Sequence, residues 1–270
     1  MVASVVETGQ AAGMADAGHA IDLSVEVIGD VETVWRAVAT GPGISSWYVP
    51  HTVEEGAGGT AMASFGPEPE MQIAGRVAVW APPRRIVFDG GENIDGLSFE
   101  WTVEPHGDNT CTVRLLNDGF ADGDPQYDAM ADGWKLFMAN LQLHLEHFAG
   151  KTATSALAMA MWPVTPEEGW EILADGLGID KMPAIGDRFD VAADEETRLG
   201  GTVVDTRHRR ISLLMDTPAP GTAFLTSEDG GGLTMVSVWL YLYGPESAAA
   251  AEHYDARWRA WLANRTPQTD

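Results

Sequence analysis

The sequence predicts an α+β protein made of two tandem domains, each an antiparallel sheet followed by a long C-terminal helix. Residues 75–119 align with residues 200–244 at a constant offset of 125, with eleven identities in 45 positions. A repeat of this length indicates duplication of a whole domain rather than a solenoid of short units. Each copy also contains several strand-like runs without a helix between them, and a helix closes each copy.

The elements of the first copy follow from short-range patterns. Residues 21–27 alternate between apolar and polar, which is typical of a half-buried strand. Asp30 is a good N-cap for a helix whose apolar residues recur at helical spacing through Val38. Gly41-Pro42-Gly43 is expected to end this helix, and residues 44–50 to form a helical turn.

Five strand-like runs come next, separated by breaks rich in Gly, Pro and Asn: 59–66, 71–80, 84–90, 96–105 and 110–118. Short spacing without helices predicts an antiparallel meander. A long helix then begins at Asp124 or Pro125 and continues to about Phe148. One helix cannot fill the concave side of a curved sheet of about six strands, so large side chains or a cavity must occupy the rest.

The predicted organisation is a flexible tail over residues 1–19, a first domain over 20–150 and a second domain over 154–265. The alignment offset is 135 at the first helix of each copy and 125 at the strands, so about ten residues after Trp35 have no counterpart after Trp170. The missing segment falls in the region that contains Trp47, Tyr48 and His51 in the first copy.

The second copy has Leu177 to Pro183 in this region, without an aromatic residue or a histidine, and Thr226 aligns with Trp101. We therefore expect the second domain to keep the fold but to have a different or vestigial pocket. It is expected to pack against the first domain within the chain, as an internal version of a homodimer, which would leave the chain a monomer.

Composition restricts the class of protein. The formal net charge of −24 provides no basic surface for nucleic acid or for an anionic membrane. Cys111 is the only cysteine, so no disulfide forms within the chain and a cytoplasmic protein is predicted. The N-terminal residues have neither the basic region nor the apolar core of a signal peptide or membrane anchor.

A candidate ligand site follows from the faces of these elements. On strand 96–105, strict alternation places Phe99 and Trp101 on the face toward the long helix. Aromatic rings combined with methionine suit a flat apolar ligand, although the same residues could form an ordinary core. The predicted ligand-binding residues are Trp47, Tyr48, His51, Phe88, Phe99, Trp101, Trp134, Phe137, Met138 and Leu141.

Three residues are candidates for catalysis. His51 and Tyr48 carry the groups best able to orient or protonate a ligand carbonyl near neutral pH. Glu100 would have to point inward, against the alternation of its strand. No cofactor motif is present, and no metal site is predicted, because His144 and His147 have no third ligand at a suitable spacing.

The whole arrangement resembles a known superfamily. The features that carry the likeness are the Trp-containing first helix, Trp47-Tyr48-Val49-Pro50, the hairpin from Gly75 to Arg85-Ile86, Phe99-Glu100-Trp101 and the closing helix with Gly133-Trp134. Together they resemble the SRPBCC (START-like) superfamily, and within it the branch related to the activator of the heat-shock ATPase co-chaperone. The resemblance implies a helix-grip fold with an apolar cavity between the sheet and the long helix.

Members of this superfamily bind lipids, sterols, polyketides and other hydrophobic molecules, and some catalyse cyclisation, aromatisation or hydrolysis. The first hypothesis is that the first domain binds or carries a hydrophobic small molecule while the second is structural. An alternative is an enzyme of the polyketide cyclase/aromatase or hydrolase type that uses the same cavity. A third hypothesis is a co-chaperone-like protein-interaction module.

Overall fold

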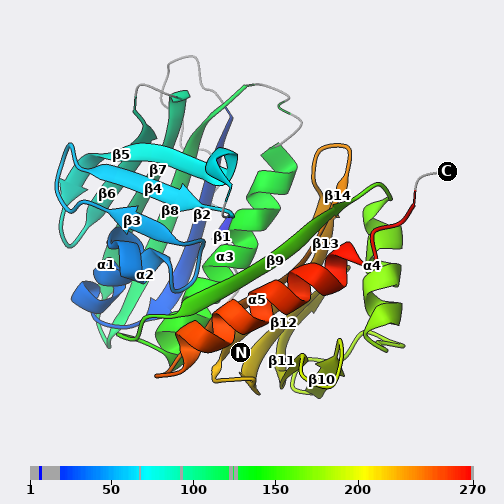
Figure 1. Cartoon of the computed structure of the whole chain (residues 1–270). Coiled ribbons are helices and arrows are strands. Elements are labelled where there is room, and N and C mark those ends of the chain that lie inside the picture. The colour runs from blue at the N-terminus through cyan, green and yellow to red at the C-terminus, as the bar shows by residue number, and fades with distance from the viewer. Residues whose placement is uncertain are drawn as a thin grey trace. The chain divides into compact units, whose positions relative to one another are not determined.

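The computed structural model describes residues 6–7, 19–66, 68–91, 94–121, 124 and 127–268. The chain divides into two compact units between Thr152 and Ala153. Each unit contains one antiparallel sheet and ends with a long helix (Figure 1). The predicted α+β class with two tandem domains is therefore confirmed.

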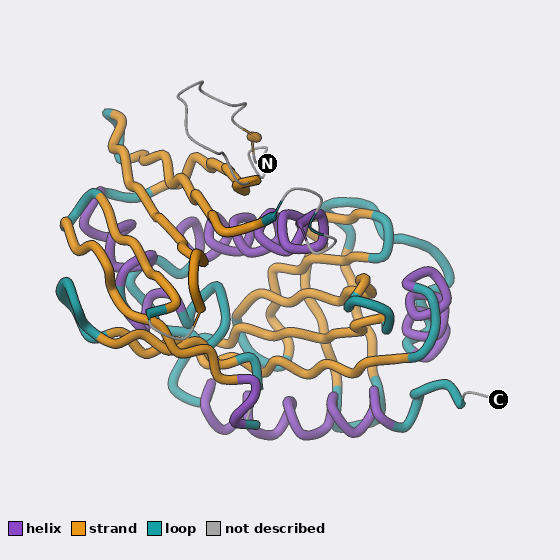
Figure 2. Tube along the Cα trace, turned by 90° about the horizontal axis from the view of Figure 1, so that it is seen from above, coloured by secondary structure: helices purple, strands orange, loops and turns teal. Residues whose placement is uncertain are grey.

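The first domain is an open eight-stranded sheet in the order β1-β2-β8-β7-β6-β5-β4-β3, in which all neighbours are antiparallel. The sheet curves around helix α3, whose buried side chains share one core with it (Figure 2). The strands are β1 (Val6–Glu7), β2 (His19–Ile28), β3 (His51–Val53), β4 (Thr60–Ser64), β5 (Gln72–Ala81), β6 (Arg85–Gly90), β7 (Ile94–His106) and β8 (Thr110–Phe120). The helices are α1 (Val31–Ala39), α2 (Gly41–Ile44), the short η1 (Pro69–Met71) and α3 (Tyr127–His147).

The start of α1 is as predicted, and its end is more elaborate. Asp30 Oδ1 accepts a hydrogen bond from the Thr33 backbone N–H (2.8 Å), which satisfies one of the free donors at the helix start. The helix ends at Ala39, but Gly41-Pro42-Gly43 then form most of α2 instead of a simple stop. Thr40 connects the two helices, because its hydroxyl accepts from the Gly43 N–H (3.2 Å).

Two other boundaries differ from the prediction. The strand β3 was not predicted; it pairs His51 with Ala63 of β4, so His51 lies at the edge of the sheet rather than in a loop. Helix α3 begins at Tyr127 rather than at Asp124, and Pro125 lies outside the described residues. Of the predicted tail, residues 6–7 pair with β2, and residues 1–5 and 8–18 lie outside the described residues.

The second domain is a six-stranded antiparallel sheet in the order β10-β11-β12-β13-β14-β9. Its elements are β9 (Thr154–Trp162), α4 (Pro166–Gly176), β10 (Arg188–Ala192), β11 (Arg198–Arg207), β12 (Arg210–Thr217), β13 (Gly221–Asp229), β14 (Thr234–Leu242) and α5 (Ser247–Ala263). Helix α5 lies along β9, the edge strand (Figure 2). Asp255 accepts from the Leu157 N–H (2.9 Å) and Arg259 donates to the Leu157 carbonyl (2.9 Å), so side chains of α5 occupy backbone groups of this edge.

The ten-residue difference between the copies has a structural counterpart. Across residues 153–268, which are described throughout, nothing corresponds to α2 or β3 of the first domain. The helix α4 is followed directly by a loop that leads into β10. The segment that distinguishes the first domain therefore contains α2, Trp47, Tyr48 and the strand of His51.

One alignment inference was wrong. The gapless alignment matches Phe224 with Phe99 and Thr226 with Trp101, but both residues face away from the core of the second domain. Ala223 and Leu225 point into that core instead. Trp101 pairs with Leu115, whereas Ala223 pairs with Leu240, the counterpart of Leu115. The strand has shifted by an odd number of residues, which exchanges its two faces, and a gapless alignment cannot detect such a shift.

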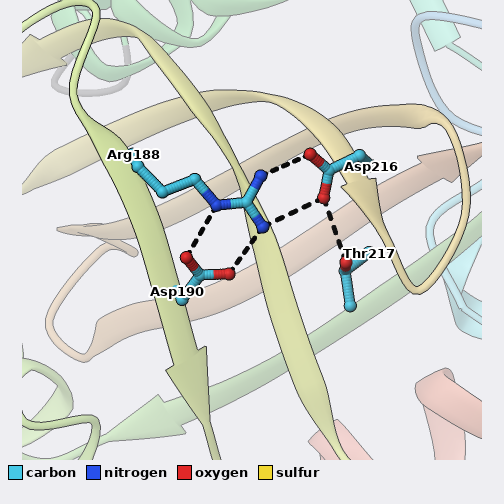
Figure 3. A network of polar contacts seen from close by, with 4 residues as sticks. All are labelled: Arg188, Asp190, Asp216 and Thr217. Carbon is cyan, nitrogen blue, oxygen red and sulfur yellow. Dashed lines mark hydrogen bonds and ion pairs between the residues drawn. The ribbon is translucent and has the colours of Figure 1, made fainter.

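A polar network lies on the outer surface of the second sheet (Figure 3). Arg188 of β10 donates to both carboxylate oxygens of Asp190 (2.6 Å each) and pairs with Asp216 of β12, while Thr217 donates to Asp216 (3.0 Å). These hydrogen bonds raise the pKa of Arg188 above its usual range. All these charged side chains are about half exposed, so the network connects β10 with β12 without forming a buried site.

Candidate functional site

Tyr48 lies at the centre of a group of aromatic rings in the first domain. Its ring centroid is 4.5 Å from that of Phe137, 4.9 Å from Trp134, 5.9 Å from Trp47 and 6.0 Å from Phe65. These separations are within the range of favourable aromatic contacts. We call this group the aromatic cluster; its members are Trp47, Tyr48, Phe65, Phe99, Trp101, Trp134 and Phe137.

The rings of the aromatic cluster differ in exposure. Three indoles form its base and are buried: Trp47 is 1% exposed, and Trp101 and Trp134 are each 4% exposed. The remaining rings, those of Tyr48, Phe65, Phe99 and Phe137, are only half-buried. Solvent therefore reaches the outer rings but not the base.

Hydrogen bonds fix the base of the cluster. Trp47 Nε1 donates to the Ala37 carbonyl of α1 (2.9 Å), and its own carbonyl accepts from Asn140 of α3 (2.9 Å). Trp134 Nε1 donates to Asn117 Oδ1 of β8 (3.0 Å). Since these partners come from helices and strands far apart in the sequence, the positions of the indoles are set by the fold.

His51 lies beside the aromatic cluster, with its ring 5.4 Å from that of Tyr48. Its Nδ1 is 2.8 Å from the Val49 carbonyl oxygen. A carbonyl can only accept, so Nδ1 carries the proton and Nε2 presents a lone pair. Burial lowers the pKa of His51 to about 4, against the opposing effect of the Val49 hydrogen bond. His51 is therefore neutral at physiological pH.

The backbone of His51 is also held in place. Its N–H donates to Ser45 Oγ (2.8 Å), and Ser45 Oγ donates to the Gly41 carbonyl (2.7 Å). A Cβ at Gly41 would lie 2.8 Å from the His51 carbonyl oxygen, so α2 can approach β3 this closely only because residue 41 is glycine. Helix α2 thus positions the strand that carries His51.

Two polar atoms of this site have no partner among the described residues, namely Tyr48 Oη and His51 Nε2. Neither is sealed in the interior. Burial raises the pKa of Tyr48 well above its usual value, so the phenol keeps its proton. The site therefore offers a neutral O–H group and a neutral nitrogen acceptor next to apolar rings.

A shallow hollow of about 430 Å³ adjoins His51. It is lined by Gly41, Pro42, Ser45, His51, Thr52, Val53 and Thr152. A volume of this size is within the usual range for small-molecule sites. His51 lines this hollow and its ring is 5.4 Å from that of Tyr48, so the hollow and the aromatic cluster both adjoin His51.

The other predicted residues lie in different surroundings. Met138 and Leu141 are fully buried in the core of the first domain, and Phe88 is half-buried against that core. Glu100 lies on the opposite face of β7 from Trp101, where it forms two hydrogen bonds with Arg85 (2.9 and 2.8 Å). Glu100 is therefore not among the groups near Tyr48 and His51.

Sequence reasoning missed three contributors to the site. Phe65 contacts Tyr48, and the alternation with buried Ala61 in the predicted strand 59–66 could have placed it on the inner face, although β4 ends at Ser64. Asn140 recurs as Asn264 in the second copy, so the repeat itself marks it. The Val49 carbonyl sets the tautomer of His51, and no side-chain pattern could have revealed it.

Among the described residues, no group of three or more His, Cys, Asp and Glu side chains is placed to hold a metal ion. No helix in the same part of the chain is long and apolar enough to cross a membrane.

The second domain differs at the corresponding places. Its Trp258 corresponds to Trp134, but Leu242 stands where the first domain has Asn117. Among the described residues, the fully buried Trp258 Nε1 has no hydrogen-bond partner. A hollow of about 370 Å³ lies beside α4, lined by Trp170, Glu171, Ala174, Asp175, Ile179, Asp180, Lys181 and Met182. It contains no histidine and only one aromatic side chain.

Residues 30–146 match the family described as "Activator of Hsp90 ATPase homolog 1-like protein". The match covers less than half of the 270 residues and lies wholly within the first domain, so the likeness to this family concerns that domain. The matched segment runs from the N-cap of α1 almost to the end of α3, so it includes α2, β3 and every ring of the aromatic cluster. The superfamily resemblance inferred from the sequence is confirmed.

A comparison with curated proteins gave no match. Among solved structures, DynU16, from the dynemicin biosynthetic locus, is 18% identical, with a TM-score of 0.40 over 90% of this chain and 95% of that one. The di-domain ARO/CYC BexL from the BE-7585A biosynthetic pathway is 16% identical, with a TM-score of 0.43 over 93% and 100%. Aha1 from Colwellia psychrerythraea is 16% identical, with a TM-score of 0.41 over 48% and 97%. The likeness to the family rests on residues 30–146 alone.

Proposed function

We propose that the first domain binds a hydrophobic small molecule against the aromatic cluster and sequesters or carries it. The observation that supports this most directly is the exposure of the outer rings. Four aromatic side chains of the cluster, those of Tyr48, Phe65, Phe99 and Phe137, are half-buried, whereas the three indoles of the cluster are buried. Covering such rings with an apolar ligand removes more apolar surface from water and adds aromatic contacts.

The charges around the site agree with an uncharged ligand. His51 is neutral, Tyr48 keeps its proton, and the carboxylate among the predicted catalytic residues, that of Glu100, is paired with Arg85 on the other face of the sheet. An ionic ligand would lose its hydration without gaining a counter-charge here. We expect the second domain to be mainly structural, because it has no counterpart of α2, β3 or His51.

A titration with the neutral fluorescent probe N-phenyl-1-naphthylamine tests this proposal on the full chain. Phe137→Ala should weaken binding about fivefold, because one ring contact contributes about 1 kcal/mol. Trp80→Ala is the matched control. Trp80 is also a half-buried aromatic residue of the first domain, but its ring contact is with Trp35 (5.2 Å) and not with the cluster. Absence of binding, or an equal loss in both folded variants, would contradict the proposal.

An enzyme of the polyketide cyclase/aromatase or hydrolase type is the second candidate. The lone pair of His51 Nε2, on a ring 5.4 Å from that of Tyr48, favours it, since a histidine and a tyrosine can exchange protons with a ligand. A pKa of about 4 nevertheless makes His51 a weak base at pH 7, and general bases work best with a pKa near the working pH. We therefore rank binding above catalysis.

A further inference from the structure

The state of His51 restricts the chemistry of the ligand further. A histidine at the edge of a cavity is usually considered as a proton donor to a ligand carbonyl. In this domain the only ring proton of neutral His51 is used, because Nδ1–H donates to the Val49 carbonyl (2.8 Å). The ring nitrogen that carries no proton is therefore Nε2, which presents a lone pair.

The tautomer is fixed by the backbone. Val49 and His51 are two residues apart, and the His51 N–H is held by Ser45 Oγ (2.8 Å). Helix α2, which carries the Gly41 carbonyl bonded to Ser45 Oγ, is held close to β3. Turning the ring so that the Val49 carbonyl faces a carbon atom would leave this carbonyl without the Nδ1–H donor.

We propose that His51 Nε2 accepts a hydrogen bond from a hydroxyl group of the ligand, so that the site selects neutral aromatic compounds bearing a phenol or enol. This inference rests on the proposed function, since the aromatic part of the ligand must contact the aromatic cluster. The hollow beside His51 gives the space for the hydroxyl-bearing end. An ether or ketone at this position would place its lone pairs against that of Nε2, and a carboxylate would add an unpaired charge.

Three probes of one ring system separate these possibilities: 2-naphthol, which donates, 2-methoxynaphthalene, which only accepts, and 2-naphthoate, which is anionic. Binding to the full chain can be followed at pH 7.5 by quenching of tryptophan fluorescence. Wild-type protein should bind 2-naphthol about tenfold more tightly than 2-methoxynaphthalene, as expected for one hydrogen bond, and 2-naphthoate most weakly.

Variants at residue 51 test whether His51 causes the preference for 2-naphthol over 2-methoxynaphthalene. His51→Leu should abolish it by weakening the binding of 2-naphthol alone, and His51→Gln should restore part of it because its amide oxygen accepts a hydrogen bond. His106→Leu is the matched control. His106 is an exposed histidine at the end of β7, bonded to Thr112 Oγ1 (2.6 Å), and its loss should leave the preference unchanged.

The results separate this inference from the proposed function. Equal binding of 2-naphthol and 2-methoxynaphthalene to the wild-type protein, or a preference that survives in His51→Leu, would overturn the role of His51 and leave the aromatic site standing. Failure of all three probes to bind would overturn the proposed function, and the inference with it.

Discussion

The two domains contain equivalent tryptophans, of which only Trp134 has a hydrogen-bond partner for its Nε1 among the described residues, and this provides an internal comparison of one hydrogen bond. Trp134 in α3 is 4% exposed and donates to Asn117 Oδ1 at 3.0 Å; Asn117 is itself fully buried. Trp258 in α5 is fully buried, and within the described residues its Nε1 has no partner. Replacing each with phenylalanine removes the same atoms from two related cores.

The expected loss of stability differs between the two replacements because they leave different polar groups unpaired. In Trp134→Phe the buried oxygen of Asn117 loses its donor, which costs about 1–3 kcal/mol in addition to the lost volume. Trp258→Phe loses similar volume but removes an unpaired N–H, so that part of the cost is offset. We expect Trp134→Phe to destabilise its domain by about 2 kcal/mol more than Trp258→Phe destabilises the other.

Hydrogen–deuterium exchange of the full chain can measure both effects, because peptides from α3 and α5 report on the two domains separately. Asn117→Leu provides the check: it should cost less in the Trp134→Phe background than in the wild-type protein, since their hydrogen bond is already absent. Equal losses of protection in the two single variants would refute the assignment of the hydrogen bond to the first domain alone.

Three further predictions concern stability. Burial lowers the pKa of His51 and of His144 from 6.5 to about 4, so the unfolded chain takes up protons that the folded chain does not. The free energy of unfolding should therefore be highest above pH 6.5 and fall between pH 6.5 and pH 4, by up to about 1.4 kcal/mol per pH unit for each histidine. In urea unfolding, His144→Leu should reduce this dependence on pH. Gly41→Ala should lower the melting temperature of the first domain by several degrees, because its Cβ would lie 2.8 Å from the His51 carbonyl, whereas Gly107→Ala, where a Cβ meets no atom within 4 Å, should not; equal effects would contradict the packing of α2 on β3. Asp190→Asn should change the free energy of unfolding by less than about 1 kcal/mol, since the pair with Arg188 is exposed; a larger loss would mean that this network stabilises the sheet more than surface ion pairs do.

Local patterns were sufficient for most of the fold. The alternation of residues 21–27 and the N-cap at Asp30 each correspond to an element of the structure, and the repeat at offset 125 predicted the second sheet. The strand β3 escaped notice because a three-residue edge strand leaves almost no periodic signal. Which residues of β13 face the core could not be predicted for a different reason. The register of a strand depends on its pairing with neighbouring strands, and the gapless alignment carried no information on that pairing.

The candidate site was likewise predictable from the sequence only in part. The sequence brought Trp47, Tyr48 and His51 together as residues that only the first copy contains, and the contacts of Tyr48 with His51 and Trp47 agree with that grouping. The direction of the His51 proton could not be predicted, since it depends on a backbone carbonyl two residues away. The different roles of Trp134 and Trp258 also depended on a partner in another strand, Asn117, which the repeat replaces with leucine.

A crystal structure of the full chain with 2-naphthol tests the central claim most directly. We predict the naphthalene ring against Tyr48 and Phe137 in the first domain, with its hydroxyl oxygen within about 3.2 Å of His51 Nε2, the usual limit for such a hydrogen bond. A ligand bound only in the second domain, or no ligand at saturating concentration, would contradict the claim that the aromatic cluster is the functional site.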